Sequence, residues 1–260
     1  MKHSQIGWLL AAAALLSACG SNNEKQPQAQ QPKSEKPAPV YYKVDPKTAG
    51  VIKGSIAFTG KRPARTPVDM SSDPACVEAH HGRAFDESAV VSPSGKLANV
   101  FVYIKTGLED KEFEPPATPV TIDQKGCWFH PRVMGIQVGQ VMHVTNSDPV
   151  THNIHPLAHI NREWNHSQGA GDPQLTRKFI KPEIMVPVKC NIHSWMHAFI
   201  GVLPHPYFAV TNEQGVFELS NVPAGTYTLA AWHEKYGTQE QSVTLSSSGT
   251  SEVTFTFKGE

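Results

Sequence analysis

The chain has 260 residues, with 23 basic and 23 acidic side chains and a formal net charge of zero. A chain without excess positive charge gives no electrostatic reason to expect a nucleic-acid partner. Thirteen histidines are many for this length, and nine of them lie between His130 and His205, which indicates one histidine-rich region.

The first residues have the pattern of a targeting segment. Lys2 supplies a positive end, and the apolar run from Ile6 to Leu16 is too short to cross a hydrocarbon core of ~30 Å as a helix. Leu16-Ser17-Ala18-Cys19 resembles the lipobox of bacterial lipoproteins, which implies a signal peptide over residues 1–18 and lipidation of Cys19. Gly20 is not the aspartate that retains such proteins at the inner membrane, so a periplasmic protein anchored to the outer membrane is favoured. The alternative is an ordinary cleaved signal with an incidental cysteine.

Three thiols remain when Cys19 is lipidated, which leaves one unpaired in an oxidising compartment. Cys190 lies beside a histidine and a methionine, so it is the thiol expected to stay free as a metal ligand. We therefore predict a disulfide between Cys76 and Cys127, which stabilises the fold by about 4 kcal/mol in the chain-entropy model. The alternative is that both cysteines stay reduced or lie apart.

Patterns typical of β-strands follow a tether rich in Gln, Pro, Lys and Ser, expected over residues 19–49. Strand-like runs occur at 51–58 and 99–104, with an ordered loop expected between them at 66–96. Beyond a proline-rich boundary at 115–119, short β-prone runs separated by turn residues continue to residue 257. No segment has sustained helical periodicity, so the expected fold class is all-β, built as two β-sandwiches.

The C-terminal part resembles the carboxypeptidase regulatory-like, or transthyretin-like, β-sandwich. The resemblance is carried by Thr211-Asn-Glu-Gln-Gly215-x-Phe217 and by Val222-Pro-Ala-Gly-Thr-Tyr-Thr-Leu229. That family begins with a strand like Gly50-Val-Ile-Lys-Gly54-Ser-Ile56. This implies a discontinuous domain of residues 50–115 plus 206–258, with a second sandwich inserted at residues 116–205.

A metal-ligand pattern lies near the end of the inserted segment. Cys190-x-x-His193-x-x-Met196 combines a thiolate, an imidazole and a thioether, a set that suits a copper ion cycling between Cu(I) and Cu(II). His152 is the expected second imidazole. Zinc would accept cysteine and histidine but not methionine, and a c-type haem requires adjacent Cys and His. A structural cluster without metal is the remaining alternative.

The inserted segment as a whole resembles the cupredoxins, the blue-copper proteins. Phe129-His130-Pro131 with Ile136-Gln-Val-Gly139-Gln-Val141, Thr145 to Asn153, and the Cys190–Met196 loop of amicyanin-type members carry the resemblance. It implies one type 1 copper ion held by His152, Cys190, His193 and Met196, with Asn153 tying the His152 segment to the Cys190 loop. Lys189 and Ser194 depart from the family's frequent aromatic residue and proline, which leaves the spectrum and reduction potential open.

Other histidines are expected to lie away from the metal. His155 and His152 are three residues apart near a strand end, so at most one is a ligand, and the His-Asn context favours His152. His143 is expected on a sheet face, His197 to point outward, and the pair His80-His81 to be solvated.

The leading functional prediction is a lipid-anchored electron carrier rather than an enzyme, because protein ligands fill the site and no catalytic constellation is evident. Its partner would be a c-type cytochrome or a dehydrogenase, docking near Trp195, Met196 and Phe199 unless these pack against the other sandwich. One alternative is copper handling or storage, with transient ligands at His155, His159, His166 and His197. Another is a partner- or glycan-binding module without a redox role.

Overall fold

The computed structural model describes residues 39–259. The predicted signal peptide, the lipidated Cys19 and most of the predicted tether lie outside the described residues. Within residues 39–259, none of the helices has the length and apolar character needed to cross a membrane.

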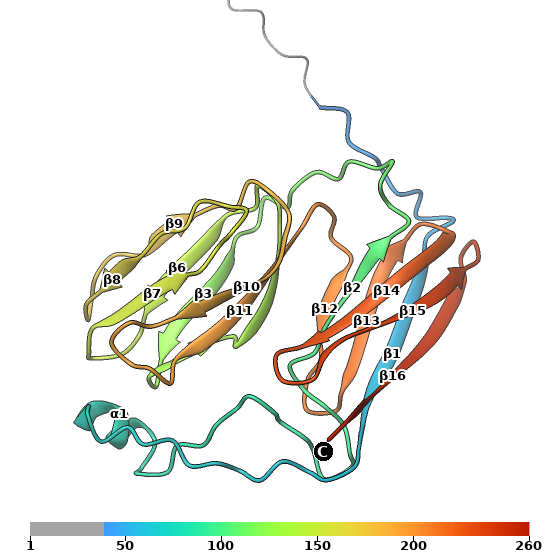
Figure 1. Ribbon diagram of the computed structural model, residues 1–260. Coiled ribbons are helices and arrows are strands. Elements are labelled where there is room, and N and C mark those ends of the chain that lie inside the picture. Colours follow the sequence, from blue (N-terminus) through green and yellow to red (C-terminus); the bar gives the residue numbers. More distant parts are fainter. Residues whose placement is uncertain (1–38, 260) are drawn as a thin grey trace, which may run out of the picture. The chain divides into compact units, whose positions relative to one another are not determined.

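Strands from the two outer parts of the chain form a first sandwich (Figure 1). These strands are β1 (Gly50–Thr59), β2 (Phe101–Thr106), β12 (Phe208–Val210), β13 (Val216–Val222), β14 (Gly225–His233), β15 (Gly237–Leu245) and β16 (Thr250–Lys258). One sheet has the order β13-β1-β16 and the other the order β12-β2-β14-β15. β1 runs antiparallel to β13 and parallel to β16, so both hydrogen-bonding partners of β1 come from the C-terminal part of the chain.

The middle of the chain forms a second sandwich by itself. Its strands are β3 (Val120–Lys125), β4 (Trp128–His130), β5 (Val133–Gln137), β6 (Met142–Asn146), β7 (His152–Pro156), β8 (His166–Gln168), β9 (Leu175–Arg177), β10 (Glu183–Lys189) and β11 (His197–Leu203). They make a sheet of order β5-β11-β10-β7-β8 and a sheet of order β4-β3-β6-β9. The all-β fold with two sandwiches is therefore confirmed, and each sheet draws its strands from only one of the two predicted domains.

Side-chain alternation explains how the first sandwich closes. Along β16, Val253, Phe255 and Phe257 point into the core while their neighbours are exposed, as expected for a sheet with one solvated face. Gly54 in β1 is needed for close packing, since a Cβ there would lie 1.9 Å from the Val253 carbonyl and 2.7 Å from the Phe217 ring. A glycine inside a strand marks such a close approach.

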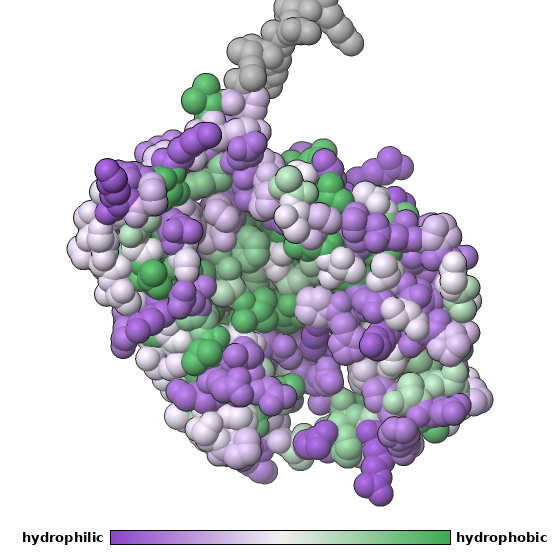
Figure 2. All heavy atoms as spheres, turned by 180° about the vertical axis from the view of Figure 1, so that it is seen from behind, coloured by the Kyte–Doolittle hydropathy of each residue, from purple (hydrophilic) through white to green (hydrophobic). Residues whose placement is uncertain are grey.

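The two sandwiches share a small apolar cluster. Phe101, Val133 and Met185 are among its buried members, and the Phe199 ring packs against Trp232 with centroids 5.0 Å apart. A largely buried ion pair flanks the cluster, with the Arg132 guanidinium donating to both oxygens of Glu234 at 2.6 and 2.8 Å. On the face shown in Figure 2, apolar residues gather in the middle and polar residues surround them.

The loop between β1 and β2 reaches the second sandwich. We call residues 66–86 the capping segment; it closes on itself through a hydrogen bond from the Asp86 amide to the Thr66 carbonyl at 2.8 Å. It contains a helix that the sequence analysis did not predict, α1 (Pro74–Ala79). Asp73 accepts a bond from the Ala75 amide and Pro74 starts the helix, an N-terminal signature that a six-residue helix is too short to show as periodicity.

The ordered chain begins before the predicted end of the tether. The Tyr42 amide donates to the Glu112 carbonyl at 2.7 Å, and the Tyr42 ring lies 5.7 Å from that of Phe113. Val44 packs against the core of the first sandwich, and the Ser248 amide donates to the Thr48 carbonyl at 3.0 Å. The prediction of a tether is therefore wrong for residues 42–49, because Tyr42, Val44 and Thr48 find partners in the first sandwich.

Candidate metal centre

The Cys190–Met196 loop joins two paired strands at one end of the second sandwich. β10 and β11 run antiparallel, and their last pair is Lys189 with His197, so the loop closes directly beyond it. The Cys190 amide donates to the Met196 carbonyl at 3.2 Å, and the Met196 amide donates to the His193 carbonyl at 3.1 Å. These bonds fix the loop in a tight turn that directs Cys190 and His193 toward the same centre.

His152 completes a cluster of three donor groups. It is the first residue of β7, and its donor atom lies within 4.8 Å of those of Cys190 and His193. The Nδ1 atoms of His152 and His193 are 3.0 Å apart, and the Cys190 Sγ lies 3.8 Å from the His193 Nδ1. The three residues are 0%, 3% and 2% exposed, respectively. The structure thus brings together three of the four predicted ligands by their donor atoms.

The other two predicted site residues lie beside this cluster. Met196 is fully buried and belongs to the same core as Cys190. Asn153 makes the link that the resemblance implies, because its Oδ1 accepts from the Asn191 amide at 3.1 Å. Its side-chain amide also donates to Asn165. These bonds hold the start of β7 against the ligand loop.

The Cys190 sulfur is surrounded by backbone donors. The amides of Asn153, Ile192 and His193 point at Sγ from 3.4, 3.4 and 3.3 Å. Burial opposes ionisation, but the hydrogen bond with His152 and these amides outweigh it, and the pKa of the Cys190 thiol lies below its usual value. The environment therefore favours a thiolate, the form that binds metals.

Both imidazoles direct their outer nitrogens at carboxylates. The His152 Nε2 lies 2.8 Å from Oδ2 of Asp148, and the His193 Nε2 lies 3.2 Å from Oδ2 of Asp73. A proton on each Nε2 satisfies these carboxylates and leaves the Nδ1 lone pairs facing inward. Two lone pairs and a thiolate then converge at one point, which is an arrangement that a metal ion fits.

The metal-free site retains a proton. Burial disfavours the charged form of His152, but Asp148 and Cys190 outweigh it and raise the pKa of this imidazole to about 9. Burial and the neighbouring charge of His152 hold the pKa of His193 below its ordinary value. His152 and Cys190 therefore share one proton, which a metal ion would displace.

The predicted disulfide is present and lies against this cluster. Cys76 and Cys127 are joined with Cα atoms 5.5 Å apart, and Cys190 is the free cysteine of the described residues. The Cys76 sulfur lies within 4.8 Å of donor atoms of Asp73 and His193, and the Cys127 sulfur is equally close to those of Asp148 and His152. The disulfide therefore connects the two carboxylate–histidine pairs.

Sequence reasoning missed the roles of Asp73 and Asp148. Asp148 lies inside the segment that carries the cupredoxin resemblance, and its oxygens also accept from the amides of Gly126 and Cys127 at 2.6 and 2.7 Å. The sequence feature that could have indicated its contact with His152 is its position four residues before that histidine. Asp73 could have been found only as a helix cap, because nothing in the sequence places residue 73 beside residue 193.

The remaining histidines lie away from the cluster, as predicted. The His155 ring contacts Glu163 Oε1 at 2.6 Å and Asn191 Oδ1 at 3.3 Å, and His197 is exposed. His80, predicted to be solvated, instead bonds the Gly126 carbonyl through Nε2 at 2.6 Å and lies edge-on to Trp128. That prediction is wrong, because the capping segment folds onto the second sandwich.

The predicted docking patch is not an open surface. Met196 is buried, Phe199 packs on Trp232, and the Trp195 indole donates to the Cys127 carbonyl at 3.2 Å. Phe199 alone of the three packs against the other sandwich, whereas Met196 and Trp195 pack within their own. Ile192, in the middle of the ligand loop, is 52% exposed instead.

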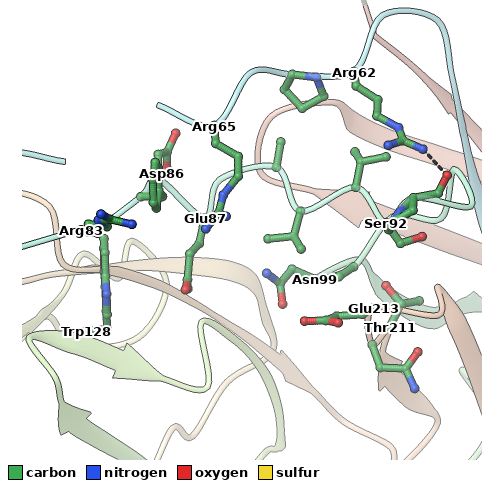
Figure 3. Close-up of a pocket in the computed structure, with 18 of the residues that line it drawn as sticks. Arg62, Arg65, Arg83, Asp86, Glu87, Ser92, Asn99, Trp128, Thr211 and Glu213 are labelled. Carbon is green, nitrogen blue, oxygen red and sulfur yellow. Dashed lines mark hydrogen bonds between the residues drawn. The ribbon is translucent and has the colours of Figure 1, made fainter. Parts of the chain in front are cut away.

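A separate cavity of about 730 Å³ lies beside the capping segment (Figure 3). Three arginines and three carboxylates line it, so its charges balance: Arg62, Arg65, Arg83, Asp86, Glu87 and Glu213. Arg62 bonds the Pro93 carbonyl, and the Arg65 guanidinium lies 4.1 Å from the centre of the Phe85 ring. Since the positive and negative side chains that line it are equal in number, the cavity gives no selective charge for a ligand.

Comparison with known families identifies the C-terminal segment. Residues 201–258 match the model of the carboxypeptidase regulatory-like domain. This part of the chain is similar to that family. The match covers β12 to β16, including the motifs at Thr211 and Val222 from which the resemblance was inferred. No curated protein sequence matches the chain.

Solved structures similar to the chain include cupredoxins. A copper-containing nitrite reductase from Thermus scotoductus is 25% identical with a TM-score of 0.32, over 39% of this chain and 25% of the reductase. A variant of amicyanin is 14% identical with a TM-score of 0.29, over 39% of this chain and 97% of that one. A purple cupredoxin from Nitrosopumilus maritimus is 21% identical with a TM-score of 0.28, over 32% and 98% of the two chains. TM-scores of this size carry no inference about the site, which rests on its own side chains.

Proposed function

We propose that this protein binds one copper ion, which His152, Cys190, His193 and Met196 would hold, and transfers single electrons. The observation that carries the proposal is the convergence of two Nδ1 atoms and a thiolate in a buried site. Copper bound to such a set supplies a one-electron couple between Cu(I) and Cu(II). The chain's own residues supply the thiolate, fix both imidazole tautomers and exclude water.

Burial of the ligands favours electron transfer over copper handling. A protein that passes copper on needs ligands that an acceptor can reach, and His152, Cys190 and His193 are all buried. The histidines expected as transient ligands for handling, His155, His159, His166 and His197, do not join the cluster. A site held in one geometry also needs little reorganisation between oxidation states, which suits a carrier rather than an enzyme.

The setting and partner are part of the same proposal. The lipobox-like Leu16–Cys19 segment supports a periplasmic protein with a lipid anchor, with the outer membrane favoured. A c-type cytochrome or a dehydrogenase is the partner class we propose. Ile192 is exposed between Cys190 and His193, so it offers such a partner an apolar contact next to the ligands.

Voltammetry of the copper-loaded protein tests the proposal. We expect a reversible one-electron wave from the wild type, and loss of that wave in His152→Ala and His193→Ala. His155→Ala and His197→Ala are matched controls, because they remove nearby imidazoles that lie outside the cluster. Tight Cu(I) binding without a reversible wave would contradict electron transfer and favour copper handling.

A further inference from the structure

His193 has a partner that comes from outside the second sandwich. Its Nε2 lies 3.2 Å from Oδ2 of Asp73, and Asp73 belongs to the capping segment between β1 and β2 of the first sandwich. The contact spans 120 residues of sequence, and His193 is 2% exposed beneath it. The imidazole edge is therefore covered by a carboxylate rather than by solvent.

Asp73 is itself held in place by several interactions. Its Oδ1 accepts from the Ala75 amide at 3.0 Å, and its carbonyl accepts from the Cys76 amide at 3.1 Å. Cys76 is bonded to Cys127, and Met70, Cys76 and Ala84 are buried in the core that contains Cys190. One carboxylate oxygen caps the helix while the other faces His193, so the side chain has little freedom to turn away.

We propose that Asp73 is a positioning residue for the metal centre, which fixes the tautomer and orientation of His193 and favours the oxidised form of bound copper. The inference rests on the proposed function. A carboxylate that accepts the outer N–H of a ligating imidazole makes the inner nitrogen a stronger donor, and loss of such a partner weakens metal binding by about 10–100-fold. Its negative charge also stabilises Cu(II) more than Cu(I).

Asp73 and Asp148 together give the two imidazoles matching support. Asp148 holds His152 from within the second sandwich, whereas Asp73 holds His193 from the capping segment. The Cys76–Cys127 disulfide lies between the two pairs. The first sandwich thus contributes to the metal site through Asp73, which lies in a segment that the disulfide bonds covalently to the second sandwich.

Asp73→Asn separates this role from folding. Asparagine caps a helix as well as aspartate does, so α1 is kept. When the asparagine oxygen accepts from the Ala75 amide, the NH2 group of the same side chain faces the Nε2–H of His193, so two donors meet and no hydrogen bond forms. Asp73→Ser keeps a capping hydroxyl that is too short to reach His193, and serves as a second variant. Asp69→Asn is the matched control, because Asp69 is an exposed carboxylate of the same segment that bonds the Ser71 amide.

The reduction potential is the first readout. We expect Asp73→Asn to weaken Cu(II) binding at least tenfold relative to Cu(I) binding, which corresponds to a rise of about 59 mV for a one-electron couple. Asp69→Asn should shift the potential much less, because solvent screens an exposed charge without direct contact. Equal shifts in Asp73→Asn and Asp69→Asn would overturn the inference while leaving the proposed function intact.

The His193 Nε2 proton is the second readout, and it does not depend on electron transfer. In the Cu(I) protein we expect a slowly exchanging imidazole N–H resonance for His193, retained in Asp69→Asn and lost in Asp73→Asn and Asp73→Ser. A resonance that persists in both Asp73 variants would overturn the inference. Wild-type protein that binds no copper would overturn the proposed function, and that result is read from the wild type alone.

Discussion

At the scale of single residues, the proposed metal centre depends on the groups that hold its candidate ligands as much as on those ligands. Asp148 accepts from the His152 ring and from the amides of Gly126 and Cys127, so one side chain orients both an imidazole and the turn that carries the disulfide. The cupredoxin-like sequence pattern singled out His152, Cys190 and His193, whose donor atoms the structure brings together, and Met196, which is buried in the same core. It could not predict Asp73, whose role depends on tertiary structure.

Asp148→Asn should weaken copper binding by about 10–100-fold, because an amide is a poorer acceptor for the Nε2–H of His152. Competition against a chelator of known affinity measures the change. Asp172→Asn is a suitable control, since Asp172 is exposed and bonds a backbone amide rather than a ligand side chain. Unchanged affinity in Asp148→Asn would show that this carboxylate does not support the site.

Copper affinity should rise with pH. In the metal-free protein the pKa of His152 is raised to about 9, so this imidazole is protonated at neutral pH and must lose its proton to bind metal. Release of one proton predicts about a tenfold gain in apparent affinity for each pH unit between pH 6 and 8. Titrations at three pH values measure the slope, and affinity independent of pH would contradict the shared proton.

At the scale of structural elements, β10, β11 and β7 position the candidate ligands, and the capping segment covers His193. The strands are predictable from β-prone runs and turn residues, and the position of the ligand loop follows from them. The capping segment has no such signal, since its order comes from Met70 and Cys76 packing into a core far away in sequence. The sequence feature that indicated this packing was the number of cysteines, from which the disulfide between Cys76 and Cys127 was predicted.

Replacing both Cys76 and Cys127 with serine should lower the free energy of unfolding by about 4 kcal/mol, because the bond closes a loop of 51 residues. Urea denaturation of the metal-free protein measures the loss. The same variant should lose copper faster to a chelator, since the segment that covers His193 is no longer anchored. A variant with wild-type stability and wild-type copper loss would contradict this role of the disulfide.

At the scale of the whole molecule, the two sandwiches are interleaved in sequence and joined by shared contacts. The motifs predicted a division into residues 50–115 plus 206–258 and 116–205, and no sheet mixes strands from both sets. The shared apolar cluster could not be inferred. Phe101 and Phe199 look like ordinary strand residues in the sequence, and only the structure shows Phe101 buried in that cluster and Phe199 packed against it.

Acid should destabilise the first sandwich through a buried neutral histidine. His205 accepts from the Tyr207 amide at 3.3 Å and donates to the Ile104 carbonyl at 2.9 Å, and burial lowers its pKa to about 4. In the unfolded chain His205 binds a proton near pH 6.5, whereas in the folded chain it stays neutral down to about pH 4. The free energy of unfolding therefore falls as the pH drops from 6.5 toward 4. For His205 alone the loss is about 2 kcal/mol at pH 5.

Urea denaturation at pH 7 and pH 5 measures this loss. His205→Gln cannot titrate, so the difference between the two pH values should be about 2 kcal/mol smaller in that variant than in the wild type. Because the two pH values are compared within each protein, the direct effect of the substitution on the free energy of unfolding cancels. An equal pH-dependent loss in both proteins would exclude His205 as a source of acid sensitivity.

The most direct test of the proposed copper centre is the visible absorption and electron paramagnetic resonance of the Cu(II)-loaded protein. A Cys190 thiolate bound to Cu(II) predicts an intense charge-transfer band and a narrow copper hyperfine splitting, both abolished in Cys190→Ser. Protein that binds Cu(II) with only a weak band and a wide splitting, unchanged in Cys190→Ser, would contradict the account.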